Sequence, residues 1–377
     1  MIDIEKILPV YRVQNDCMVS GQGDLTIAFR VAHMDIFSAS AADYDALHHS
    51  WLKALRILPA HTIVHKQDYF IRSAHQGNSA AEASFLTRKA EQAFEGREFL
   101  KHRCYLMLTR KALGRRDASS GYSTLMRKAI VPSHVLDERL LMDFQEKAGA
   151  FVQILSDSGL IGLTRIHDDE LTGTTGAAGI IEQYCFLQQP DALPLIRDVH
   201  LKDGIRIGDD RLQIFGLSEL DQLPSLCGSR ITYDKYSTDK TRFSIGFASN
   251  LGMLLDCNHM YNQYLFIGDS QQALKSLERK RLRLQSLSAY SRENAIAAQA
   301  TADFLNEAIA SQRMPVKAHF NLMVWTNDSA KMQELRNQAG AAMAAMDAVA
   351  KQETDGAPQI WWAGIPGNAA DFPMNDA

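Results

Sequence analysis

Hydrophobic and polar residues alternate along the first hundred positions in a way that predicts short strands between helices. Large apolar residues occupy every second position from Leu25 to Val31, which is the period of a half-buried strand. The Gly-containing segment 21–24 suits a hairpin turn after an earlier strand at 17–20. Two further strands are expected at 62–65 and 104–109.

Segments whose apolar residues recur at helical spacing lie between these strands. A helix should begin after Ser40 and end before Pro59, and a second should lie near 84–95. The resulting order of two strands, helix, strand, helix and strand predicts an open antiparallel sheet with helices on one face.

Residues 110–132 have the composition of a junction, because the cations Arg110, Lys111, Arg115 and Arg116 precede small residues and Pro132 closes the stretch. We therefore expect an N-terminal lobe over 1–130 and a second lobe over 131–377. The second lobe should open with a helix from Ser133 to about Asp157, since its apolar residues recur at helical spacing.

The pattern after residue 160 favours strands, then long helices. A helix from about 270 to 313 should break near 286–291, and a strand at 320–324 should precede a helix with its apolar face over 332–346. The fold class predicted is α+β, with two lobes of mixed, mainly antiparallel sheet covered by helices. The strands expected in this region lie at 163–167, 205–207, 212–217, 242–247, 253–256 and 263–267.

The last residues, 355–377, are rich in Gly and Pro and predict a loop with no packed element. Such a tail is typical of a natural C-terminus and equally of a chain cut at a domain boundary.

Composition narrows the function classes. Of 377 residues, 46% are hydrophobic and 22% charged, which excludes a mainly disordered chain. The net charge of −4 argues against a general nucleic-acid coat. No apolar run is long enough to span a membrane and the N-terminus lacks a secretory signal. Five dispersed cysteines indicate free thiols in a reducing cytoplasm.

A search for motifs with chemical function is negative. The dipeptide Gly-Lys is absent, which excludes a P-loop, and the Gly-rich segment 173–179 is interpreted as a flexible turn. The pairs His48/His49 and Cys257/His259 lack partners at zinc-ligand spacing. Asp168, Asp169 and Glu170 fit the acidic first turn of a helix. We predict no catalytic, cofactor-binding or metal-binding residue.

Two features stand out as a candidate interaction patch. The cations Arg279, Lys280, Arg281 and Arg283 lie on a helix beside a leucine seam formed by Leu274, Leu277, Leu284 and Leu287. They form either a solvated face or a contact with an acidic partner or nucleic acid. Trp361 and Trp362 in the tail either pack on a missing part of the protein or cap the local core.

Three stretches resemble a known family: RKRLRLQSLSAYSREN at 279–294, PVKAHF at 315–320, and GAPQIWWAGIPGNAADFP at 356–373. Together with ILPVY at 7–11 and CGSRITYDKYSTD at 227–239, they resemble the TraG family of conjugation ATPases from Bacteroides-type conjugative transposons.

The resemblance implies an energy protein of a type IV secretion apparatus that drives conjugative DNA transfer. In that family an N-terminal region precedes a motor domain with Walker motifs, and this chain resembles only the N-terminal region. It therefore implies a non-catalytic docking and assembly region, cytoplasmic and peripheral at the inner membrane. Its partners would be apparatus subunits, its own motor domain and further copies of itself. ATP and Mg would belong to the motor alone.

Two alternatives stay open. The basic helix at 279–283 would suit a nucleic-acid-binding module, and a stand-alone enzyme with an unrecognised site would require a deep pocket with convergent polar groups.

Overall fold

A computed structural model describes residues 8–35, 38–77, 84–112, 138–189, 192–217, 231–232, 244–245, 251–252 and 255–373. Residues 113–132 of the predicted junction at 110–132, Ser133 at the start of the next predicted helix, and most of the segment 227–239 lie outside these residues. The division into two lobes at residue 131 therefore stays a prediction.

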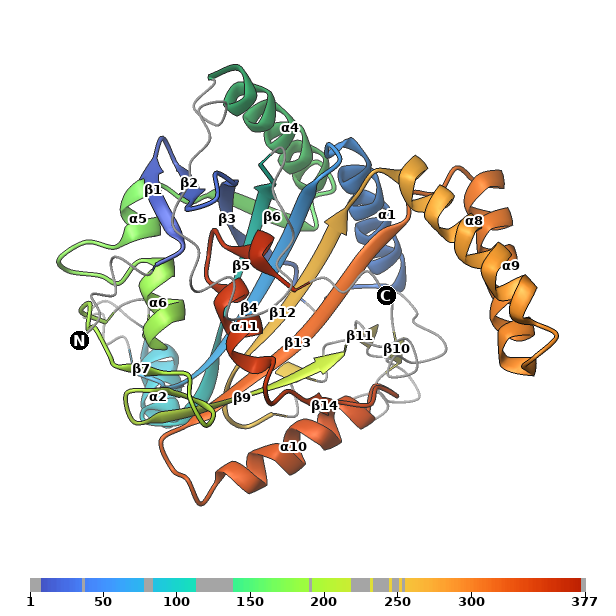
Figure 1. The fold of residues 1–377 in the computed structure, drawn as a ribbon. Helices are drawn as coiled ribbons and strands as arrows, with labels where there is room; N and C mark the ends of the chain where they lie inside the picture. Colours follow the sequence, from blue (N-terminus) through green and yellow to red (C-terminus); the bar gives the residue numbers. More distant parts are fainter. Residues whose placement is uncertain are drawn as a thin grey trace.

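Within the described residues, twelve strands form one sheet in which every neighbouring pair is antiparallel (Figure 1). Its order is β1-β2-β3-β5-β4-β12-β13-β9-β8-β7, with β6 beside β3 and β14 beside β9. The strands are β1 (Val10–Gln14), β2 (Cys17–Ser20), β3 (Leu25–His33), β4 (Thr62–Ala74), β5 (Glu98–Arg110), β6 (Ile161–Arg165), β7 (Val199–His200), β8 (Ile205–Ile207), β9 (Asp210–Leu217), β12 (Asn258–Ile267), β13 (Val316–Thr326) and β14 (Lys351–Gln352).

This sheet joins strands from both sides of the predicted junction, because β4 pairs with β12 along nine residues from His259↔Phe70 to Ile267↔Thr62. The predicted α+β class with a mainly antiparallel sheet is confirmed. A separate short pair is formed by β10 (Ile231–Thr232) and β11 (Ser244–Ile245). The predicted strand at 253–256 is wrong for the described residues 255–256, where the next strand begins only at Asn258.

Helices cover both faces of the sheet, so the prediction of one covered face is wrong. Phe151 and Leu155 of α4 and Trp51 of α1 pack on one face, and Met343 of α10 packs further along that face. The opposite face carries α5, α6 and α11. The helix bounds are α1 (Ala41–Ile57), α2 (Phe85–Phe94), α4 (Glu138–Ser156), α5 (Asp168–Thr172), α6 (Ile180–Phe186), α8 (Ser270–Leu287), α9 (Arg292–Ala310), α10 (Met332–Ala344) and α11 (Ala357–Gly364).

The start of α1 follows the predicted capping residue. The Ser40 hydroxyl accepts from the Asp43 backbone N–H while the Asp43 carboxylate accepts from the Ser40 N–H, which closes a capping box at the start of α1. Ser291 caps α9, and the break between α8 and α9 falls where it was predicted.

The C-terminal residues form a packed element, which corrects the prediction of a loop without one. Helix α11 and a short 3-10 helix (Ala369–Asp371) are buried on the sheet face that also carries α6. Small residues make this possible, because a Cβ atom on Gly364 would lie 2.1 Å from the Tyr184 hydroxyl oxygen. Gly367 has φ of +89°, a left-handed conformation that favours glycine. The Gly-rich composition therefore reflects close packing here.

Candidate functional site

Helices α8 and α9 form an antiparallel hairpin that we call the arm, defined as residues 270–310. The arm joins β12 to β13, two strands that pair with each other as far as Ile267↔Val316. It is therefore inserted where a short turn could connect the strands, and it projects from one side of the molecule (Figure 1).

The predicted basic cluster lies on the arm. Arg279, Lys280 and Arg283 are exposed. Arg281 is half-buried and donates to Glu278 at 2.7 Å, an ion pair within one helical turn. Three of the four predicted cations thus form the solvated face, and the fourth is paired within the helix.

The arm also exposes more apolar surface than its predicted leucine seam implied. Leu274, Leu277 and Leu284 are half-buried, as a seam between two helices requires, whereas Leu287 is exposed. No residue of α8 is fully buried. The large apolar side chains exposed on the arm are Leu282, Leu287, Tyr290, Ile296, Phe304 and Ile309.

Trp361 and Trp362 do not belong to an exposed patch. Both lie in α11 and are 3% and 7% exposed within the core beneath it. Of the two sequence interpretations, packing on the local core describes their position. The candidate interaction surface is therefore the arm without these two indoles.

A second constellation of chemical groups lies on the sheet face that carries α1, α4 and α10. His33, Asp68, His102 and Cys104 come from three neighbouring strands, and Asp68 is directly opposite Cys104 in the β4–β5 register. Because side chains alternate between faces along each strand, all four point to the same side. Cys104 belongs to the core under α1 and α4, on the same sheet face as the core under α10.

Asp68 is the centre of this constellation. Its Oδ1 accepts a hydrogen bond from His102 Nε2 at 2.9 Å and lies 3.7 Å from His33 Nε2. Its Oδ2 accepts from the Lys66 ammonium. Burial alone would raise the pKa of Asp68, but the Lys66 charge and the two histidines outweigh it and hold the pKa well below its usual range. Asp68 is therefore an ionised carboxylate in a buried position.

Burial has the dominant effect on the nearby thiol and on His33. It raises the pKa of Cys104 well above its usual range and lowers the pKa of His33. A protonated thiol is a weak nucleophile, so this arrangement does not favour a cysteine nucleophile. Histidine nitrogen, carboxylate oxygen and cysteine sulfur are, however, all ligands for a divalent transition metal.

The sequence alone does not reveal this constellation, because its members are spread over residues 33–104. The signal that could have found it is the strand alternation, which assigns each residue to a face. Without the strand order β3-β5-β4, however, the faces cannot be matched. The two pairs that the sequence offered as possible zinc ligands lie elsewhere. His259 Nδ1 donates to the Cys257 backbone carbonyl at 2.9 Å, and His48 and His49 are exposed on α1.

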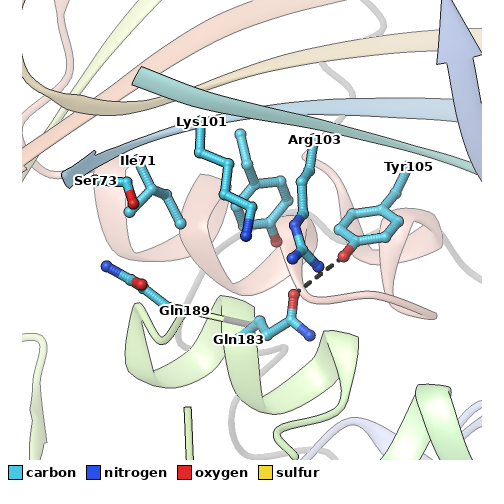
Figure 2. Close-up of a pocket in the computed structure, with 8 residues that line it drawn as sticks. Ile71, Ser73, Lys101, Arg103, Tyr105, Gln183 and Gln189 are labelled. Carbon is cyan, nitrogen blue, oxygen red and sulfur yellow. Dashed lines mark hydrogen bonds between the residues drawn. The ribbon is translucent and has the colours of Figure 1, made fainter. Parts of the chain in front are cut away.

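The opposite face holds a small pocket between β4, β5 and α6. Figure 2 shows Lys101, Arg103 and Tyr105 extending from β5 toward Gln183, to whose amide oxygen the Tyr105 hydroxyl donates at 3.1 Å. The remaining lining residues are Tyr69, Ile71, Ser73 and Gln189. Polar and cationic side chains thus stand beside the apolar surface of Ile71 and the tyrosine rings in this pocket.

The other predicted features have plain structural roles. Asp168, Asp169 and Glu170 form the first turn of α5, as predicted, and the Asp168 backbone N–H donates to Asp16 Oδ1 at 3.1 Å. The segment 173–179 is a tight turn between α5 and α6. The cysteines that the structure describes, Cys17, Cys104, Cys185 and Cys257, are free, and Cys227 lies outside the described residues.

None of the described helices has the length and apolarity needed to cross a membrane. Comparison with family models matches residues 1–49 to a family described as "Domain of unknown function, B. Theta Gene description (DUF3875)". No curated protein matches the chain. The matched segment comprises β1 to β3 and the first half of α1, and it is consistent with a protein of Bacteroides origin.

Proposed function

We propose that this chain is the N-terminal docking and assembly region of a TraG-type conjugation ATPase. Its work in conjugative DNA transfer is adhesion: it binds subunits of the type IV secretion apparatus at the cytoplasmic side of the inner membrane and positions the motor there. The observation that carries the proposal is the arm, a helical hairpin inserted between two paired strands. The sequence resemblance at 279–294, 315–320 and 356–373 supplies the family.

The arm has the properties of a protein-binding element. Leu282, Ile296 and Phe304 are 53%, 62% and 47% exposed, and Tyr290 at the turn between the helices is 86% exposed. Apolar side chains that remain exposed on one projecting element are typical of a surface that another protein covers. Tyrosine is also enriched among residues that dominate binding energy. The exposed cations Arg279, Lys280 and Arg283 extend this surface toward an acidic partner.

The proposal assigns no chemistry to the chain. The sequence has no Gly-Lys dipeptide and hence no P-loop, so the purified chain should neither bind ATP tightly nor hydrolyse it. Steady ATP turnover above a no-protein blank would overturn this assignment.

Transfer frequency in cells tests the docking role. Leu282→Glu and Ile296→Glu should be introduced into the full-length ATPase, with Leu86→Glu on α2 as a matched control, since Leu86 is 77% exposed outside the arm. We expect the arm variants to lower conjugative transfer by roughly tenfold or more, as the loss of an interface hot spot would. The control should transfer normally. Normal transfer by both arm variants at normal protein levels would contradict the proposal.

A nucleic-acid-binding function is the second candidate, and the three exposed cations on α8 are the observation that favours it. The Arg281–Glu278 pair reduces the local positive charge. Binding to nucleic acid would depend steeply on salt concentration, which distinguishes this function from protein docking.

A further inference from the structure

We propose that His33, Asp68 and Cys104, with His102 supporting the Asp68 carboxylate, form a binding site for a single divalent transition-metal ion of the zinc class. One ligand atom each from His33, Asp68 and Cys104 lies within 4.8 Å of the other two. His102 Nε2 donates a hydrogen bond of 2.9 Å to Asp68 Oδ1 and orients that carboxylate from outside the donor cluster. Three protein donors leave the fourth position of a tetrahedral zinc site to a water molecule.

The donor chemistry selects the class of ion. An imidazole and a thiolate beside a single carboxylate suit Zn²⁺, Co²⁺ or Fe²⁺ and disfavour Mg²⁺ and Ca²⁺, ions that prefer oxygen ligands only. The three donors stand on paired strands, with Cys104 facing both Val31 of β3 and Asp68 of β4. Strand positions hold ligands in a more fixed geometry than loops do.

The surroundings orient the ligands and leave a path for the ion. Phe70 stacks on the His102 ring with centroids 4.4 Å apart, and the His33 and His102 rings stack nearly parallel at 5.5 Å. The histidine side chains are 35% and 36% exposed, whereas Asp68 and Cys104 are buried. An ion arriving from solvent would therefore meet the two imidazoles before the thiol and the carboxylate.

Metal binding releases one proton to solvent. The Cys104 thiol gives up this proton and the resulting thiolate binds the ion, while neutral His33 binds through its unprotonated ring nitrogen and keeps its proton on the other. His102 keeps its Nε2 proton in the hydrogen bond to Asp68. Asp68 is already ionised because Lys66 neutralises it in the absence of metal. The Lys66 ammonium beside the thiolate compensates part of its charge, and the loaded site keeps one net positive charge.

Cobalt provides a direct probe, because a thiolate bound to Co²⁺ gives a sulfur-to-metal charge-transfer absorption. The purified full chain should be stripped with chelator and titrated with Co²⁺. We expect about one Co²⁺ per chain, the charge-transfer band, and displacement by Zn²⁺. Cys104→Ser should lose the band. Cys185→Ser is the matched control, since Cys185 is equally buried on the opposite face and should keep it.

His33→Gln separates binding from folding, because the partly exposed His33 side chain can be replaced without opening the core. This variant should weaken Co²⁺ affinity by roughly tenfold or more. Zn²⁺ should also raise the melting temperature of the wild-type chain by about 5 °C when free metal is roughly 100-fold above Kd. A wild-type chain that shows no charge-transfer band would overturn the site, and so would an unchanged band in Cys104→Ser. The wild-type titration decides the matter even if Cys104→Ser fails to fold.

Discussion

The hydroxyl of Tyr184 donates a hydrogen bond of 2.8 Å to the backbone carbonyl of Trp361, 177 positions further along the chain. The bond attaches α11 to α6 over the middle of the sheet. A second hydrogen bond holds α11 at its last residue: Gln67 Nε2 donates to the Gly364 carbonyl at 2.8 Å. The C-terminal segment is thus bound to the core by polar contacts as well as by the burial of two indoles.

Gly364→Ala should destabilise the chain, since the new Cβ would overlap the Tyr184 hydroxyl. We expect a loss of about 2 kcal/mol, in the range for overpacked cores. Tyr184→Phe alone should cost about 1 kcal/mol, because the Trp361 carbonyl loses its donor. The double variant should lose less than the sum of the two, because removing the hydroxyl also relieves part of the overlap. Chemical denaturation measures all three, and strict additivity would refute this packing.

Asp68→Asn should destabilise the metal-free chain by about 3 kcal/mol, because it leaves the Lys66 ammonium, whose side chain is only 18% exposed, without its counter-charge. Replacing both partners, as in Asp68→Asn with Lys66→Met, should restore part of that loss. Urea denaturation in chelator provides the measurement. A double variant that is less stable than Asp68→Asn would show that the ion pair does not carry the effect.

Stability should fall as the solution becomes acidic. Burial lowers the pKa of His65 to about 3 and those of His259 and His319 to about 4. An unfolded chain protonates these histidines near pH 6.5 while the folded chain does not. Their contribution to stability is therefore full above about pH 6.5 and is lost as the pH falls toward 4, by about 1.4 kcal/mol per pH unit for each histidine.

Urea denaturation at several pH values between 7.5 and 5 measures this slope. His319→Asn should flatten it by the contribution of one histidine, whatever the variant does to absolute stability. The same slope in His319→Asn and wild type would contradict the assignment of a buried neutral His319.

The docking proposal and the nucleic-acid alternative differ in their salt dependence. If Arg279, Lys280 and Arg283 each neutralised one phosphate, log K would fall against log salt with a slope of about −2.7. We expect instead that a variant with all four basic residues of 279–283 changed to Ala elutes from a DNA column at the same salt as wild type. Clearly earlier elution of the variant would favour the nucleic-acid function.

Local signals in the sequence were enough to predict most helices and several strands. The alternation at 25–31 and the cap at Ser40 each describe a few neighbouring residues, and the structure confirms them. Strand β1 was not predicted, although the Asn15-Asp16 pair that follows it is typical of a two-residue hairpin turn. Both residues have positive φ in the structure, as such a turn requires.

Non-local relationships could not be predicted. The side chains of His65 and Asn262 meet at 3.2 Å across the β4–β12 pair, and no local pattern selects that pairing over another. The His33, Asp68, His102 and Cys104 constellation depends on the same strand order. In the C-terminal segment, composition was misleading: glycine served there for close approach to Tyr184, and the adjacent indoles were the better indication of burial.

Photo-crosslinking from the turn of the arm is the most direct test of the central claim that this element binds the secretion apparatus. A photoreactive phenylalanine analogue should replace Tyr290 in the full-length protein in conjugating cells, and Leu193, which is 72% exposed outside the arm, provides the control position. The account predicts a covalent adduct with an apparatus subunit from position 290 and none from position 193. Irradiation that gives no adduct from position 290, or adducts with DNA alone, would contradict it.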